Sequence, residues 1–138
     1  MRAGSGFTLA QRTRLQKACE TAEEGSGFRF GIAIGPASGD LREEGERALA
    51  RLADGHALGA VLVLVDPGAR RLEILTTGTA RRRLTDQQCA LAALSMTTSF
   101  GVGNLVGGLV DGLRMLADGA RASDQLAAIG GSPVRQGD

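Results

Sequence analysis

Two aspartates stand where an α/β protein could hold a metal ion. Asp40 follows Ser38 and Gly39 directly after a predicted strand, and Asp86 opens a predicted helix. Open α/β sheets bind ligands at the carboxyl ends of their strands, so we expect Asp40 at such an edge. Carboxylate oxygens suit hard cations, and the only cofactor these residues suggest is a divalent cation, Ca²⁺ or Mg²⁺. Helix capping and the helix dipole already account for an acidic residue at both positions.

Five arginines form the best candidate for an anion-binding surface. They are Arg70, Arg71, Arg81, Arg82 and Arg83, and Thr77 lies between the two groups. If the strand and the loop that contain them fold together, their guanidinium groups can bind a phosphate or carboxylate bidentately. The alternative is that this run of charged residues simply forms a solvent-exposed face of the protein. The sequence leaves both interpretations open, together with a partner that is either a small anionic ligand or an unknown protein.

The remaining nucleophiles and bases do not form a catalytic pattern. His56 is the only histidine, so a pair of histidine metal ligands cannot exist. The sequence has no nucleophile elbow, and we interpret His56 as a solvated loop residue. Cys19 and Cys89 lie far apart and lack the spacing of a metal site. We expect two small buried side chains in a reducing cytoplasm, with a Cys19–Cys89 disulfide as the alternative.

A glycine-rich stretch, residues 101–108, is not interpreted as a dinucleotide-binding loop. Its third glycine falls one place late for that motif, and no strand is predicted before it. The spacing of Gly103, Gly107, Gly108 and Gly112 instead suits close packing of a helix against the sheet or another helix.

Composition argues against several classes of function. The chain has 138 residues, a net charge of +1, no Trp or Tyr, and four Phe. Nucleic-acid-binding proteins normally carry a basic excess, and single-strand binders stack bases on aromatic side chains, so we expect no nucleic-acid partner. The first residues do not resemble a signal peptide, and no apolar run reaches the roughly 18 residues of a membrane span. We therefore expect no transmembrane segment and a cytoplasmic location.

The elements that must position these residues begin with three helix-capping signals. The pairs with capping-box spacing are Thr8 with Gln11, Asp40 with Glu43, and Thr85 with Gln88. A glycine-containing stop at 25–27 ends the first helix. Helices are thus predicted over about 9–22, 40–52, 86–100 and 105–122.

Three strands complete the expected fold. Residues 28–34 alternate between apolar and other side chains, and residues 61–65 are apolar on both faces, as in a central strand covered on both sides. Asp66-Pro67-Gly68 predicts a turn, after which 71–76 returns antiparallel. The order α-β-α-β-β-α-α predicts an α/β fold, a three-layer α/β/α sandwich with a small mixed sheet.

We expect one domain with two flexible ends. Its predicted boundaries are 1–6 for a flexible N-terminus, 7–122 for the domain and 123–138 for a flexible C-terminal tail. The tail begins where the sequence turns towards Gly130-Gly131-Ser132-Pro133, which favours fraying. The oligomeric state is left undetermined by the sequence.

Residues 7–122 resemble the TPM domain family, and the resemblance is most specific in the last third of the domain. The residues that carry the resemblance are Leu84-Thr85-Asp86, followed by Phe100, Gly103, Gly108, Leu109 and Gly112. The apolar strand 61–65 and the Arg70-Arg71 pair at the following hairpin also match. The resemblance implies an α/β/α sandwich of the kind found in envelope and membrane-linked proteins. It further implies the divalent-cation site and phosphatase activity that have been proposed for plant members.

The sequence departs from that family where its polar groups are expected. Leu58-Gly59-Ala60 replaces an Asp-Asn-Gly step, and Thr76-Thr77-Gly78 replaces Gly-Tyr-Gly. Leu105 stands at an aromatic position and Asn104 at an acidic one. The chain therefore looks like a divergent, actinobacterial-type branch. We expect a non-catalytic binding module, with a divalent-metal-dependent phosphatase-like hydrolase, using Asp40 and Asp86, as the alternative.

Overall fold

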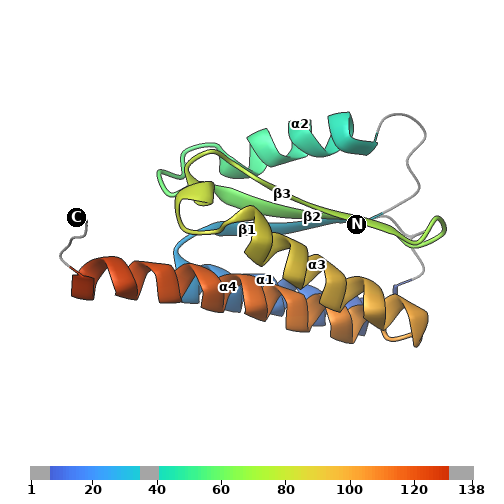
Figure 1. The fold of residues 1–138 in the computed structure, drawn as a ribbon. Coiled ribbons are helices and arrows are strands. Elements are labelled where there is room, and N and C mark those ends of the chain that lie inside the picture. The colour runs from blue at the N-terminus through green and yellow to red at the C-terminus, as the bar shows by residue number, and fades with distance from the viewer. Residues whose placement is uncertain (1–6, 35–40, 131–138) are drawn as a thin grey trace.

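The protein is a mixed three-stranded sheet between two layers of helices (Figure 1). The computed structural model describes residues 7–34 and 41–130. Strands β1 (Arg29–Ile34), β2 (Ala60–Asp66) and β3 (Arg71–Thr76) lie in the order β1-β2-β3. β1 pairs with β2 in parallel, and β2 pairs with β3 antiparallel. This confirms the predicted fold class and element order.

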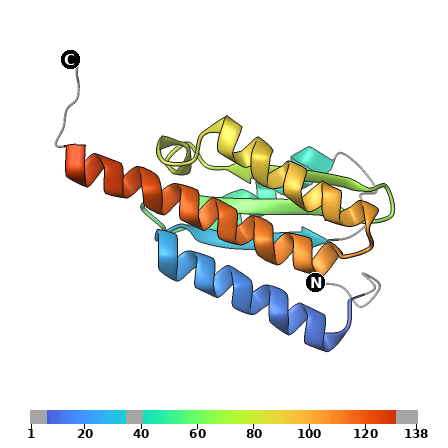
Figure 2. The ribbon, with the colours of Figure 1, turned by 60° about the horizontal axis from the view of Figure 1, so that its bottom comes forward.

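Helices cover the two faces of the sheet unequally. Helix α2 (Leu41–Ala53) lies on one face, whereas α1 (Leu9–Ser26), α3 (Asp86–Gly101) and α4 (Leu105–Gly130) lie on the other (Figures 1 and 2). The arrangement follows from β2, all of whose residues are buried. Val61, Val63 and Val65 pack in the core shared with α1, α3 and α4, while Leu62 and Leu64 pack towards α2. A strand buried on both faces must be apolar at every position, as the sequence shows.

The helix ends confirm two of the three capping predictions. In α1 and α3, Thr8 and Thr85 accept from the backbone N–H of Gln11 and Gln88, whose side chains bind back to the capping residue. The third predicted cap, Asp40, lies outside the described residues. Helix α1 runs to Ser26 rather than Ala22, because the Ser26 hydroxyl donates to Ala22 O within the last turn at 2.7 Å. The two confirmed caps fix where α1 and α3 begin.

Helix α4 is longer than the sequence indicated. It continues to Gly130, whereas the prediction ended it at Ala122 and placed 123–138 in a flexible tail. Residues 123–129 contain neither glycine nor proline, so nothing in them breaks a helix before Gly130. The last turns of α4 extend past the sheet (Figure 2). Residues 1–6 and 131–138, the other predicted flexible ends, lie outside the described residues.

Glycines bring α3 and α4 together as predicted. A Cβ atom on Gly108 would lie 2.4 Å from Ser99 Cβ, and one on Gly112 would lie 2.1 Å from Met96 Cε. These separations are shorter than any van der Waals contact, so larger residues would push the helices apart. Close helix packing therefore accounts for Gly108 and Gly112. Gly103 instead has a φ of +76° and open space around it, and a Cβ on Gly107 would meet only the side chain of Asn104.

Candidate functional site

The five arginines of the predicted anion site do not form one cluster. Arg70 and Arg71 lie at the β2–β3 turn, whereas Arg81–Arg83 follow the other end of β3, in and after a short 3₁₀ helix, η2 (Ala80–Arg82). A strand of six residues spans about 17 Å, so a single anion cannot bridge the two groups. The expectation of one bidentate cluster is therefore wrong. The two groups are close in sequence but are separated by the length of β3.

Arg83 takes part in the packing between α1 and β1. Its Nη2 donates to Ser26 O at 3.1 Å, and its guanidinium carbon lies 4.7 Å from the centre of the Phe28 ring. The Phe28 ring is itself buried in the core. A cation over an aromatic face is attracted by the ring quadrupole. Arg83 thus links the end of α1 to the segment that precedes α3.

Thr77 also has a structural role in the described residues. Its Oγ1 accepts from Ala60 N at 3.1 Å and from Ala80 N at 3.3 Å, and it shares a hydrogen bond with Thr79 Oγ1. Its backbone N–H donates to Ala60 O at 3.1 Å. An anion would have to compete with these bonds for the hydroxyl group. Thr77 therefore extends the β2–β3 ladder into the following loop.

Three of the predicted residues meet along the free edge of β3. Thr77, Arg81 and Asp86 line a groove of about 600 Å³, together with Leu49 and Ala50 of α2. Arg81 donates from Nε to Thr76 Oγ1 and from Nη2 to Thr76 O, at 3.2 and 3.1 Å. Asp86 is exposed in the first turn of α3. We call this the β3-edge groove.

The second predicted cation ligand, Asp40, lies outside the described residues. In residues 7–34 and 41–130, no three His, Cys, Asp or Glu side chains gather as a metal site would require. His56 accepts a hydrogen bond at Nε2 from Arg29 Nη1 at 2.8 Å when its proton is on Nδ1. In the described structure His56 therefore contacts an arginine.

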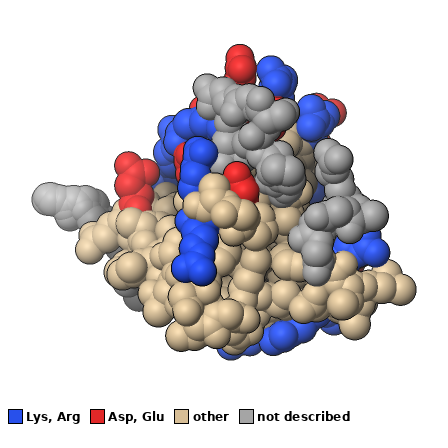
Figure 3. All heavy atoms as spheres, turned by 90° about the vertical axis from the view of Figure 1, so that its right-hand side faces the viewer, with Lys and Arg blue, Asp and Glu red and all other residues tan. Residues whose placement is uncertain are grey.

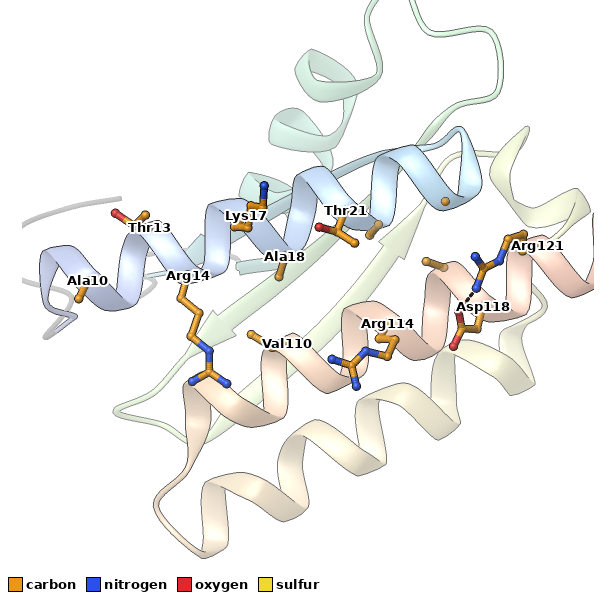
Figure 4. A pocket seen from close by; sticks show the side chains of 13 residues that line it. Ala10, Thr13, Arg14, Lys17, Ala18, Thr21, Val110, Arg114, Asp118 and Arg121 are labelled. Atoms are coloured by element: carbon orange, nitrogen blue, oxygen red, sulfur yellow. Dashed lines mark hydrogen bonds and ion pairs between the residues drawn. The ribbon is translucent and has the colours of Figure 1, made fainter.

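A second groove, more apolar and not indicated by the sequence, lies between α1 and α4 (Figure 4). It has a volume of about 590 Å³. Alanines and other small residues line it, and they are Ala10, Ala18, Ala22, Gly25, Val110 and Ala117. Ala22 and Ala117 are buried, while Thr13 and Thr21 are exposed along the α1 side. We call this the α1–α4 groove.

The rim of the α1–α4 groove is basic. Its charged lining residues are Arg14, Lys17, Arg114, Arg121 and a single acid, Asp118. Arg121 is paired with Asp118, and Arg114 lies 3.8 Å from Asp111. Within the part of the chain that the structure describes, Arg14 and Lys17 form no ion pair. Figure 4 shows Arg14 reaching from α1 towards α4.

The helical layer carries little charge around α3 and the start of α4. Residues 87–110, which include most of α3 and the start of α4, contain no Asp, Glu, Lys or Arg. Figure 3 shows how charge is distributed on one end of the molecule. Charged side chains gather in the upper half, and the lower half is largely uncharged. Lys and Arg side chains appear again at the lower border. The acids of α1, Glu20, Glu23 and Glu24, do not line the groove. The charged side chains that border the apolar α1–α4 groove are therefore mainly basic.

The two cysteines are free thiols with low reactivity. Burial, with smaller contributions from Glu23 and Glu20, raises the pKa of Cys19 to about 12. Burial also raises the pKa of Cys89, with Asp86 adding to the effect and Arg81 opposing it. Both cysteines are unpaired, as expected, but they are only partly buried, whereas the sequence predicted buried side chains. A nucleophilic cysteine needs a lowered pKa, so these residues lack the property that such catalysis requires.

We expect the raised pKa values to protect both thiols from alkylation. At pH 8, iodoacetamide should modify Cys19 at least about tenfold more slowly in the folded chain than in urea, because the thiolate is the reactive form. The neutral thiol favours the folded state, so its contribution to stability is full below the ordinary pKa of 9.0 and is lost as the pH rises towards about 12. Mass spectrometry of the Cys89→Ser variant isolates Cys19. Equal rates in the folded and unfolded chain would contradict the assignment.

Comparison with known proteins decides the family. The family described as "Domain of unknown function (DUF5130)" matches residues 2–117, most of the chain. The chain belongs to this family. The DUF5130 match does not name the TPM family, so the resemblance of residues 84–112 to TPM domains stays a prediction.

Solved structures share the DUF5130 fold at low sequence identity. The BA42 protein of the psychrophilic bacterium Bizionia argentinensis is 17% identical, with a TM-score of 0.77 over 88% of this chain and 86% of that one. The N-terminal domain of a P. gingivalis protein is 17% identical, with a TM-score of 0.71 over 87% and 80%. The N-terminal domain of the cg2496 protein of Corynebacterium glutamicum is 14% identical, with a TM-score of 0.64 over 99% and 85%. At these identities the likeness establishes the fold alone.

Among the residues that the structure describes, no helix of this DUF5130 domain is both long enough and apolar enough to cross a membrane.

Proposed function

We propose that this DUF5130 domain is a non-catalytic binding module for an anionic partner, and that the partner binds in the α1–α4 groove. The observation that carries the proposal is Arg14, a cation with no ion pair among the described residues, beside an apolar groove of about 590 Å³. Arg114 and Arg121 face it from α4 (Figure 4). Apolar lining with a few charged groups is typical of a ligand-binding groove.

The sequence favoured a binding surface formed by Arg70, Arg71 and Arg81–Arg83, which we call the arginine edge. We propose the α1–α4 groove in its place. Arg83 and Thr77 are engaged in the contacts described above, and Arg70 and Arg71 lie at the far end of β3. At the η2 end of β3, Arg82 is the one arginine of residues 81–83 that is exposed and forms no side-chain hydrogen bond or ion pair within the described residues. Binding to a partner through one exposed arginine would be weak, since exposed ion pairs contribute about 0–1 kcal/mol.

A titration with polyglutamate tests the proposed function. At low salt, about 20 mM, we expect saturable amide shifts in ¹⁵N spectra that cluster at residues 10–25 and 110–121. The Arg14→Glu/Arg114→Glu variant should weaken binding about tenfold or more, because two attractive charges become repulsive. The Arg70→Glu/Arg82→Glu variant has the same net charge and should bind as the unmodified protein does. Shifts centred on residues 81–83, or equal losses in both variants, would refute the groove as the site.

A second candidate function rests on the β3-edge groove. Thr77, Arg81 and Asp86 line one groove, and Leu84-Thr85-Asp86 is the step that resembles the TPM family most closely. A divalent-metal-dependent phosphatase-like hydrolase would use Asp86 with Asp40 as cation ligands and Arg81 or Thr77 at the phosphate. Adding Mg²⁺ or Ca²⁺ and then phenyl phosphate to the same NMR sample separates the two functions. Saturable shifts at Thr77 and Asp86 would support the hydrolase, and flat spectra would exclude it.

A further inference from the structure

The α1–α4 groove is long, straight and bounded by two parallel helices. Both helices run in the same direction (Figure 2), and Gly25, near the end of α1, lies where a Cβ would be 3.7 Å from Arg121 Nη1. Its α1 lining extends from Ala10 to Gly25. At a rise of 1.5 Å per residue, the groove is about 22 Å long. This is the length of a helix of about 15 residues.

The inner surface of the groove permits a backbone to approach closely. Ala18, Ala22, Gly25 and Ala117 line it, and none of these carries an atom beyond Cβ. Helices pack 8–10 Å apart, and the shorter distances occur where the contacting side chains are small. A third helix laid along this groove would therefore contact both α1 and α4. Its own central residues must be small or aliphatic to bury against the alanines.

The positive charges are distributed along the groove instead of converging. Arg14 and Lys17 lie three residues apart on α1, and Arg114 and Arg121 lie seven apart on α4. Residues at spacings of three and seven share a helix face, so each helix carries two cations along the groove, and on α4 Asp118 lies between them and pairs with Arg121. Strong recognition of a single phosphate requires donors that meet at one point. Two rows of cations instead match two rows of carboxylates.

We propose that the groove binds an acidic amphipathic α-helix of a partner protein, an inference that rests on the proposed function. The helix would place small and aliphatic residues against Ala18, Ala22 and Ala117, and Asp or Glu along both flanks. Its carboxylates would pair with Arg14 and Lys17 on one side and with Arg114 and Arg121 on the other. This is the helix-in-groove mode of recognition, in which positions i, i+3, i+4 and i+7 make the apolar contacts.

A designed peptide tests the inference directly. An alanine, leucine and glutamate peptide of about 18 residues would carry Ala and Leu at i, i+3, i+4 and i+7 and Glu on the flanks. A shuffled peptide of the same composition has the same charge without the apolar stripe. Fluorescence anisotropy at about 100 mM salt should show the amphipathic peptide binding at least about tenfold more tightly than the shuffled one. Circular dichroism of the peptide should show increased helicity on binding.

A variant that blocks the groove sterically distinguishes binding of a helix from attraction between charges alone. Thr21 is exposed and lines the groove, so a tryptophan at this position (Thr21→Trp) would fill the groove and leave every cation in place. The variant should bind the amphipathic peptide about tenfold more weakly, and polyglutamate should still bind. Gln16→Trp, at an exposed position on α1 that does not line the groove, is the matched control and should bind the peptide normally.

Each outcome has one meaning. Equal affinity for the amphipathic and shuffled peptides would refute the helix-binding inference and leave the proposed anion-binding function in place. If the protein also failed to bind polyglutamate, both the inference and the proposed function would be refuted. Binding to phosphatidylglycerol vesicles without binding to the amphipathic peptide would also overturn the helix, because the anion would then belong to a lipid surface.

Discussion

Replacing Gly59 with alanine should lower the free energy of unfolding by about 3 kcal/mol or more. Gly59 has a φ of +94°, a conformation that costs an L-residue roughly 1–2 kcal/mol. A Cβ there would also lie 2.2 Å from Thr77 Oγ1 and 2.3 Å from Thr79 Oγ1. Thr77 Oγ1 cannot move aside without breaking its bonds to Ala60 N and Ala80 N, and Thr79 Oγ1 cannot move aside without breaking its bond to Thr77 Oγ1.

Gly55 supplies the matched control for this prediction. Its φ is +79°, yet a Cβ there would meet nothing within 4 Å. Gly55→Ala should therefore cost only the conformational strain, roughly 1–2 kcal/mol. Urea unfolding of the two variants measures the difference, which reports the steric clash at Thr77 and Thr79. If Gly59→Ala unfolds at the same urea concentration as Gly55→Ala, the packing of this loop is not as described.

The local signals in the sequence predicted most of the fold. Capping at Thr8 and Thr85 depends on residues three positions apart, and the apolar run 61–65 depends on adjacent positions. Such patterns are set by hydrogen bonding and burial within one element, so they can be recognised without knowing the neighbours. The same holds for the antiparallel return of 71–76 after the Asp66-Pro67-Gly68 turn, where Asp66 Oδ1 accepts from Ala69 N.

The candidate site could not be predicted in the same way. The α1–α4 groove combines residues about 100 positions apart in the chain, for example Arg14 with Arg114. Spacing within α1 shows that Arg14 and Lys17 share a face, but not that α4 lies beside it. The five arginines do not form a single cluster for the reverse reason, because residues close in sequence are separated by the length of β3. Distances along the chain indicate which residues share an element, not which elements share a site.

Replacing Phe28 with alanine should cost about 3–5 kcal/mol of stability, the second large effect. Phe28 is 1% exposed and lies between the end of α1 and the start of β1. Its ring is 6.4 Å from that of Phe30, and the Arg83 guanidinium lies over it. The variant therefore removes a large core side chain together with the aromatic partner of Arg83. Thermal and urea unfolding measure the loss, which should exceed that of an exposed control, Leu94→Ala.

A double-mutant cycle with Arg83→Met then shows what Arg83 does. Methionine keeps most of the length of the side chain but removes the charge and the bond to Ser26 O. We expect a coupling energy between the Phe28→Ala and Arg83→Met changes of about 0.5–2 kcal/mol, the size of a cation–π contact. Arg83→Met alone should lower stability and leave polyglutamate binding unchanged, because an anion would have to detach the guanidinium from Phe28 and Ser26. Zero coupling with weakened binding would instead return Arg83 to the anion-binding surface and favour the arginine edge over the α1–α4 groove.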